Sequence, residues 1–182
     1  MTYRKTLRDA ALAQYGYVTV DDASRFGIDT GELRNIARRG GLTHVAYGLY
    51  RFDDVPPTHF DQYMEAVLRV GSHAYLTHDA VLSLHGLGLV NPSVIRVGTP
   101  KRTQAKLPSW LEVVRQDVHP EDLTVYEAIP STTVRRALLD CRGLIMTERL
   151  LEAASEAADR GLLRRRERQG TIDTLKSPGH FT

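Results

Sequence analysis

The sequence predicts a two-part α+β protein, and three observations indicate this fold class. Two short amphipathic helix patterns begin ten residues apart, at Thr19 and Asp29, and a glycine-tipped hairpin pattern follows at residues 42–52. From residue 93 onward, three β-branched runs lie between helical patterns. We therefore expect a winged helix-turn-helix at residues 1–54. At residues 58–170 we expect an α+β domain with a small antiparallel sheet flanked by helices, and we expect residues 171–182 to fray.

The helix-turn-helix prediction depends on residues that begin and end helices. Thr19 is suited to cap the first helix, and Asp22 occupies the capping-box position three residues later. Gly27 supplies the left-handed residue that ends this helix. Asp29 begins the second helix, with Glu32 at the matching position. This spacing of two helix starts is typical of a helix-turn-helix.

The second of these helices has an apolar face and a polar face. Leu33, Ile36 and Ala37 lie at helical spacing and are expected to pack inward. Arginine and asparagine can hydrogen-bond base edges in the major groove, and arginine also binds phosphates. The polar face therefore predicts DNA binding, and the alternative is an ordinary solvated helix face. The candidate DNA-binding residues on it are Thr30, Gly31, Arg34, Asn35, Arg38 and Arg39.

The hairpin is expected to turn at Ala46-Tyr47-Gly48, because Gly48 readily adopts the positive φ that such a turn needs. Residues 1–53 contain eight Lys or Arg and six Asp or Glu. DNA binding would therefore depend on where the charges lie and not on a large positive field. Three hairpin side chains complete the candidate interface: His44, Tyr47 and Arg51.

Composition excludes several classes of protein. The chain has 182 residues and a net charge of +2, and its single cysteine, Cys141, cannot form an intramolecular disulfide or a multi-cysteine zinc site. Cys141 lies on an apolar helix stripe, which predicts a buried thiol. No apolar run approaches the ~18 residues of a membrane helix, and the polar N-terminus lacks a signal-peptide core. We therefore expect a cytoplasmic protein.

The remaining elements are predicted from hydrophobic periodicity and from residues that interrupt or end helices and strands. Two prolines at Asp53–Pro57 interrupt regular structure and suggest a domain boundary there. The expected elements outside the helix-turn-helix are a helix at 4–15, helices at 59–70 and 77–88, strands at 93–100, 111–118 and 123–130, and helices from 132 to 141 and from 147 to 161.

The order of these blocks resembles the AbiEi family, the antitoxins of type IV abortive-infection toxin–antitoxin pairs. The similar segments are Gly48 to Phe52, Leu76 to Leu87, Ser93 to Pro100 and Ile129 to Asp140. The resemblance covers residues 5–168 and depends on the order and spacing of the blocks, because no single block is specific. The resemblance is weakest after Arg168.

The resemblance implies an antitoxin without enzymatic activity. Its N-terminal module would repress its own operon by binding inverted repeats in double-stranded operator DNA, as a dimer or as cooperating monomers. Its C-terminal domain would neutralise a separately encoded nucleotidyltransferase-like toxin, directly or indirectly. The alternative is a free-standing winged-helix regulator whose C-terminal domain senses a ligand or dimerises.

The sequence contains no convincing catalytic or metal site, so we expect no cofactor. His78, Asp79 and His85 could be considered as metal ligands, but two helix turns separate the histidines and no third ligand is evident. Val81 stands where a nucleotidyltransferase would need its second acid, and no Glu-x-Lys is present for a metal-dependent nuclease.

Two basic clusters remain as candidate partner-binding sites. The alternative for each is a solvated surface. Their functional interpretation is contact with an acidic partner surface, or additional phosphate contacts on DNA. The first cluster, on a loop expected to join two hairpin strands, is Lys101, Arg102 and Lys106; the second, on the terminal helix, is Arg164, Arg165 and Arg166, with Arg168 beside them.

Overall fold

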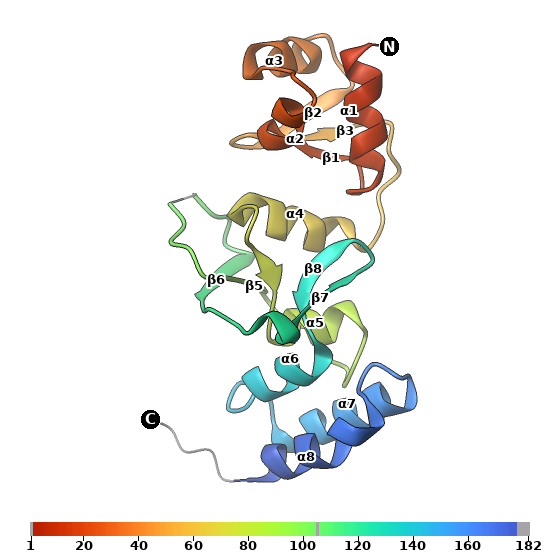
Figure 1. The fold of residues 1–182 in the computed structure, drawn as a ribbon, viewed down its shortest axis with the longest axis vertical. Coiled ribbons are helices and arrows are strands. Elements are labelled where there is room, and N and C mark those ends of the chain that lie inside the picture. Colours follow the sequence, from red (N-terminus) through yellow and green to blue (C-terminus); the bar gives the residue numbers. More distant parts are fainter. Residues whose placement is uncertain (1, 105, 178–182) are drawn as a thin grey trace. The chain divides into compact units, whose positions relative to one another are not determined.

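The computed structural model describes residues 2–104 and 106–177, and its fold is mixed α+β with helices and two sheets (Figure 1). The chain divides into two compact units. The first consists of Met1–Ser72 with Thr103–Ala105, and the second of His73–Arg102 with Lys106–Thr182. None of the described helices combines the length and apolar character that a membrane span requires.

The first unit combines four helices with a three-stranded antiparallel sheet of order β1-β3-β2 among its described residues. Leu7, Val18, Leu33 and Phe52 are among the side chains that form its buried core. Its elements are α1 (Tyr3–Leu12), β1 (Tyr17–Thr19), α2 (Val20–Arg25), α3 (Thr30–Arg38), β2 (Leu42–Ala46), β3 (Leu49–Phe52) and α4 (Asp61–Val70).

The predicted helix starts are confirmed. The Thr19 side chain accepts a hydrogen bond from the Asp22 amide, and the Asp22 carboxylate accepts one from the Thr19 amide, which completes a capping box. Asp29 Oδ1 accepts a hydrogen bond from the Glu32 amide at 2.9 Å. Gly27 ends α2 with a φ of +70°. These local interactions fix the short turn between α2 and α3.

The predicted hairpin is also confirmed, with β2 and β3 paired and Gly48 at a φ of +67° in the turn. Strand β1 was not predicted from the sequence; it adds a third strand by pairing with β3 in the register Tyr17 to Arg51. A three-residue strand shows too little alternation to be recognised from sequence.

Helix α4 belongs to the first unit, so this unit extends past the boundary expected at residues 54–58. Arg51 on β3 donates to Asp61 at 2.7 Å, and Tyr17 on β1 donates to Glu65 at 2.8 Å. Arg69 donates to the carbonyl of Val45 on β2. The helix is thus tied to all three strands by partly buried polar contacts.

The second unit contains a five-stranded sheet, and most of its helices follow the last strand in the sequence. Its elements are β4 (Tyr75–Leu76), α5 (Asp79–Leu84), β5 (Ile95–Thr99), β6 (Leu111–Arg115), the 3-10 turn η1 (Pro120–Asp122), β7 (Leu123–Tyr126), β8 (Ile129–Thr132), α6 (Val134–Asp140), α7 (Thr147–Asp159) and α8 (Arg165–Lys176).

The prediction of a purely antiparallel sheet is wrong, because the sheet is mixed. Its order is β6-β5-β4-β8-β7, with β5 parallel to β6 and β4 parallel to β8. The loop from β5 to β6 is therefore a crossover and not a hairpin. The run expected as one strand at 123–130 is instead a hairpin, in which Glu127 and Ala128 form the turn.

The C-terminal segment also differs from the expected frayed tail. Helix α8 continues to Lys176, and Thr171 and Leu175 are buried. The helix persists beyond Gly170 because these two side chains are buried against the rest of the second unit. Residues 178–182 of the expected tail lie outside the described residues.

Candidate nucleic-acid interface

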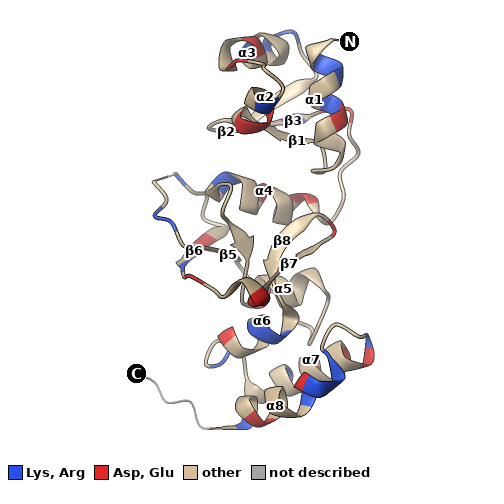
Figure 2. Cartoon of the chain, viewed as in Figure 1, with Lys and Arg blue, Asp and Glu red and all other residues tan. Residues whose placement is uncertain are grey.

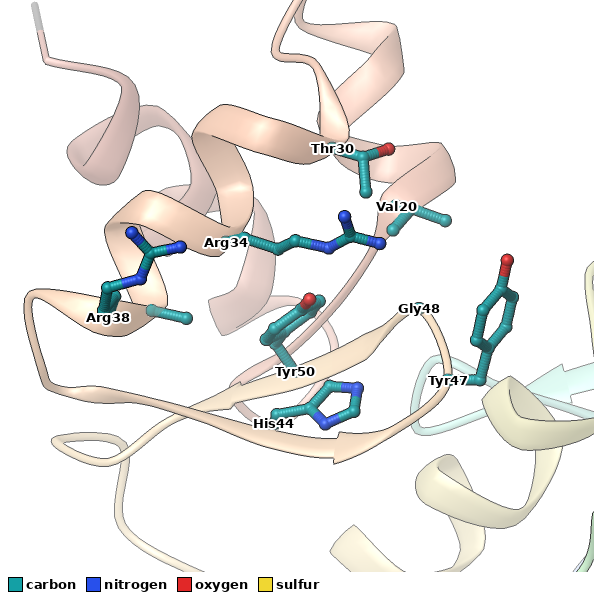
Figure 3. Close-up of a pocket in the computed structure, with 9 residues that line it drawn as sticks. Val20, Thr30, Arg34, Arg38, His44, Tyr47, Gly48 and Tyr50 are labelled. Carbon is teal, nitrogen blue, oxygen red and sulfur yellow. The ribbon is translucent and has the colours of Figure 1, made fainter.

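A hollow of about 460 Å³ lies in the first unit between helix α3 and the hairpin β2–β3 (Figure 3). One side is formed by α3 and the other by the two strands and their turn. The side chains and backbone that line it belong to Val20, Thr30, Arg34, Ala37, Arg38, His44, Tyr47, Gly48 and Tyr50. The structure thus brings together five of the nine predicted DNA-binding residues, from separate elements, around one space.

The position of each basic side chain follows from the packing of α3. Leu33 and Ile36 are buried, which turns the opposite face of the helix outward. Arg34 and Arg38 lie four residues apart on that exposed face, so they stand one helical turn from each other. In Figure 3 the Arg34 side chain extends from α3 across the space, toward the side occupied by Val20 and above Tyr50.

The hairpin supplies aromatic rings to the same hollow. His44 on β2 and Tyr50 on β3 are paired across the strands, and their ring centroids are 5.0 Å apart. Tyr50 is almost fully buried and forms the floor, whereas Tyr47 at the turn is 98% exposed. An exposed aromatic side chain at a hairpin tip has no packing role in the unit and is available to contact a partner.

Arg34 and Arg38 differ from the other arginines of the first unit. Neither has a hydrogen-bond or ion-pair partner among the described residues, so both guanidinium groups are available to a ligand. The other six arginines each contact an acidic group or a carbonyl oxygen: Arg4, Arg8, Arg25, Arg39, Arg51 and Arg69. The two arginines that face the hollow are those left unneutralised.

The positive charge at the hollow comes from individual side chains and not from the unit as a whole. None of its described lining residues is acidic. Figure 2 shows both signs of charge on α1, α2 and α3, so the first unit as a whole does not present a single-sign field. Two unpaired guanidinium groups without an opposing carboxylate would favour an anion, and phosphate oxygens match their donor geometry.

Three predicted residues lie beside the hollow and do not line it. Gly31 and Arg39 are exposed and Asn35 is half-buried on α3. Arg39 also forms a long ion pair with Glu32, with 3.9 Å between Nη1 and Oε1. These residues extend the polar surface of α3 beyond the hollow.

The structure does not place Arg51 where the sequence analysis expected it. Successive strand residues point to opposite faces, so Arg51 lies on the other side of the sheet from its neighbour Tyr50. There it pairs with Asp61, donates to the carbonyl of Val55, and lies over the Tyr17 ring. The prediction that Arg51 projects from the hairpin is therefore wrong, and its role is structural.

Sequence reasoning missed Tyr50 and Val20 as lining residues. The missing information for Tyr50 was the strand register, because the pairing of His44 with Tyr50 puts both rings on one face. Val20 is brought to the hollow by the close approach of Gly48, since a Cβ added at Gly48 would lie 3.1 Å from Val20 Cγ2. Only the packed structure reveals this second contact.

In the second unit, the three residues considered as metal ligands are engaged separately. His78 Nδ1 lies 3.0 Å from Thr77 Oγ1, and Asp79 pairs with Arg96. His85 packs against the Tyr126 ring, and burial lowers its pKa to about 4 with a further contribution from Arg160. Among the described residues no cluster of three possible ligands exists.

Cys141, the C-cap residue of α6, is fully buried, as the apolar stripe of this segment predicted. Burial raises the pKa of this thiol, and the negative charges of Asp79 and Asp140 add to the effect. The thiol is therefore protonated at neutral pH, and a nucleophilic role would require the thiolate.

The two basic clusters lie on different elements of the second unit. Lys101, Arg102 and Lys106 are exposed on the crossover between β5 and β6, whose central residue 105 is outside the described part. Arg164 occupies the N-cap position of α8, with Arg165 and Arg166 in the first turn, and all three are exposed. The structure does not join them into one site.

Comparisons with known proteins give no family assignment. No protein-family model and no curated protein matches the chain. Among solved structures, a crystal structure of the RV2827C protein from Mycobacterium tuberculosis is similar at a TM-score of 0.42 and 14% sequence identity, covering 98% of this chain and 83% of that chain. A likeness of this size does not bear on the function of this chain.

Proposed function

We propose that the first unit is a winged helix-turn-helix that binds double-stranded DNA, with α3 in the major groove and the hairpin β2–β3 as the wing. The single observation that carries the proposal is the pair of unneutralised arginines, Arg34 and Arg38, facing a hollow whose described lining has no acid. The short, capped α2–α3 pair and the glycine-turned hairpin support the same assignment.

The proposed roles combine residues that line the hollow with their neighbours on α3. Arg34 and Asn35 would contact base edges, with Thr30 and Gly31 allowing the first turn of α3 to approach them. Arg38 and Arg39 would contact phosphates, and His44 and Tyr47 would hold the backbone beside the wing. Arg51 is left out of this set because it pairs with Asp61.

We further propose that this DNA-binding protein is the antitoxin of a type IV pair that represses its own operon. The support is the AbiEi-like order of segments from residue 5 to residue 168. In this proposal the second unit counters a nucleotidyltransferase-like toxin, and the chain itself is not an enzyme. The protein would act in the cytoplasm, where both operator and toxin are found.

Two experiments separate these proposals. Fluorescence anisotropy with duplexes from upstream of the chain's own reading frame, compared with unrelated duplexes, tests sequence-specific DNA binding. Co-expression with the product of the adjacent reading frame tests the antitoxin role through growth rescue. Specific DNA binding without rescue would leave a free-standing regulator, whereas absence of specific binding would reject the DNA-binding proposal.

A further inference from the structure

The start of helix α8, the last helix labelled in Figure 1, carries a dense group of basic residues. Four of the five residues from 164 to 168 are arginines, and all four are exposed. The group belongs to the second unit and shares no residue with the hollow of the first unit. We call it the α8 arginine cluster, and it consists of Arg164, Arg165, Arg166 and Arg168.

The guanidinium groups of the cluster are almost unused within the molecule. Arg164 forms only a long ion pair with Glu167, with 3.9 Å between Nη1 and Oε1. No hydrogen bond or ion pair to another described residue engages the side chains of Arg165, Arg166 and Arg168. These three side chains therefore keep their full set of N–H donors for a partner outside the chain.

The positive charge is concentrated at the cluster and not spread over the surrounding helices. Residues 147–176, which include α7 and α8, contain seven Lys or Arg and six Asp or Glu. Glu156 of α7 pairs with Arg160. The other carboxylates of α7 form no ion pair with the cluster in the described structure, and an exposed carboxylate out of contact attracts a guanidinium only weakly through water. These carboxylates are Glu148, Glu152 and Asp159.

The segment that carries the cluster exposes no large apolar side chain between residues 160 and 177. Leu163 and Leu175, near the two ends of α8, are buried. A protein interface has an apolar centre, and a helix on a membrane surface inserts apolar side chains. A nucleic-acid interface needs neither, because it is polar and strongly positive. The composition of this surface therefore favours a nucleic acid over an acidic protein or a membrane.

The type and spacing of the basic residues also suit phosphate groups. Arginine presents a rigid fork of N–H donors that matches two phosphate oxygens, whereas lysine offers a point charge. Arg165 and Arg168 are three residues apart and are therefore neighbours on the helix surface. Arg166 adds a third guanidinium within the same turn.

We propose that the α8 arginine cluster binds the phosphate backbone of duplex DNA without reading its sequence. Phosphate contacts carry no sequence information, so the cluster would add affinity for any duplex and no preference among duplexes. The choice of DNA as the nucleic acid rests on the proposed function of the first unit, whereas the affinity for phosphate does not. The second unit would thus contribute its own share of the DNA contacts.

The test uses the full chain carrying Arg34→Ala and Arg38→Ala, which removes the main contacts proposed for the first unit. Anisotropy titrations at about 50 mM salt should still show binding to a random-sequence duplex. Adding Arg165→Gln, Arg166→Gln and Arg168→Gln should weaken this binding at least about tenfold and lower the slope of log affinity against log salt by roughly two to three. An unchanged slope would overturn the proposal, as would absence of binding before the α8 substitutions.

A second triple variant controls for net charge. Arg115→Gln, Arg149→Gln and Arg160→Gln remove the same amount of charge from exposed positions outside α8. In the same background this variant should weaken binding by less than about twofold. Equal losses in the two triple variants would show a general effect of net charge and would overturn the proposal.

Chemical shifts give a measurement that requires no change in α8. In the ¹⁵N-labelled chain with Arg34→Ala and Arg38→Ala, the random duplex should shift the amides of residues 164–169 and leave those of residues 111–115 in place. Absence of shifts at residues 164–169 would contradict the proposal. Tighter binding of this chain to phosphatidylserine vesicles or to polyglutamate than to the duplex would overturn it in favour of a membrane or an acidic protein.

The preference between duplexes separates this proposal from that for the first unit. In the otherwise wild-type chain, the α8 triple variant should weaken binding to upstream and random duplexes by the same factor. A chain that shows no preference for the upstream duplex, but keeps the slope that depends on α8, would reject specific binding by the first unit and support the cluster. A preserved preference with an unchanged slope would do the reverse.

Discussion

Arg51 on β3 donates a hydrogen bond from Nη2 to Asp61 Oδ2 on α4 at 2.7 Å, and both side chains are largely buried. The ion pair joins the three-stranded sheet to the helix that follows it. Arg51 also donates to the carbonyl of Val55 and lies over the ring of Tyr17, whose pKa is raised by burial and by Glu65. This relationship makes Arg51 a structural residue of the first unit.

We predict that Arg51→Ala destabilises the protein without removing a DNA contact. Loss of one partner leaves the Asp61 carboxylate partly buried and unpaired, so the free energy of unfolding should fall by roughly 1–3 kcal/mol. Urea denaturation measures this change. Unchanged stability combined with weaker DNA binding would show that Arg51 contacts DNA after all.

The sequence was most informative where structure is determined by near neighbours. The capping box of Thr19 with Asp22, the cap at Asp29 and the turn at Gly48 could all be predicted because each depends on residues a few positions apart. The spacing of the apolar residues on α3 also predicted which face of the helix is exposed. The candidate residues Arg34 and Arg38 were found for that reason.

Long-range pairing could not be predicted in this way. The parallel contact of β5 with β6 depends on a crossover whose described residues form no helix, whereas such connections are usually recognised by one. The β7–β8 hairpin was missed because Glu127 and Ala128 both adopt positive φ in its two-residue turn without a glycine. The position of Arg51 required the strand register and the docking of α4.

The turn at Gly48 should be sensitive to any added side chain. Gly48→Ala would place a residue at a φ of +67° and a Cβ 3.1 Å from Val20 Cγ2. We predict a loss of about 1–2 kcal/mol in stability and weaker DNA binding, because the hairpin side of the hollow would shift.

Gly170→Ala is the matched control for this substitution. Gly170 lies within α8, and apart from its own chain neighbours and the nearby backbone of that helix, no described atom stands within 4 Å of a Cβ added there. Alanine there should stabilise the protein by about 0.5–1 kcal/mol and leave DNA binding unchanged. If both alanine variants behaved alike, the strained turn would not be the cause.

Burial of His85 predicts a dependence of stability on pH. Its pKa is lowered to about 4 in the folded protein, from an ordinary value of 6.5, mainly by desolvation and secondarily by Arg160. Between these two values the unfolded chain binds more protons, so stability rises with pH. Acidification from pH 6.5 to 4 should therefore remove up to roughly 3 kcal/mol of stability through this residue.

Thermal or urea unfolding across this pH range, with His85→Asn as the test variant, measures the effect. The variant should reduce the slope but not abolish it, because burial also lowers the pKa of His78. His73→Asn, at a solvent-exposed position, serves as the control and should retain the wild-type slope. A wild-type slope in His85→Asn would show that His85 does not titrate as its burial requires.

Arg34 is predicted to contact a base and Arg38 a phosphate. Arg34→Ala should cost about 1–3 kcal/mol on the operator and relax the preference at one base position. Arg38→Ala should weaken operator and random DNA alike and lower the dependence on salt by about one phosphate contact. Equal loss on both DNAs for Arg34→Ala would make Arg34 a phosphate contact instead.

The most direct test of the account is the affinity of the Arg34→Ala/Arg38→Ala double variant for duplex DNA from upstream of the chain's own reading frame. Anisotropy titrations would compare it with the wild type and with Arg8→Ala, whose charge Asp54 already neutralises. We predict that the double variant loses specific binding while folding normally, and that Arg8→Ala binds as the wild type does. Wild-type affinity in the double variant would contradict the assignment of this hollow to DNA.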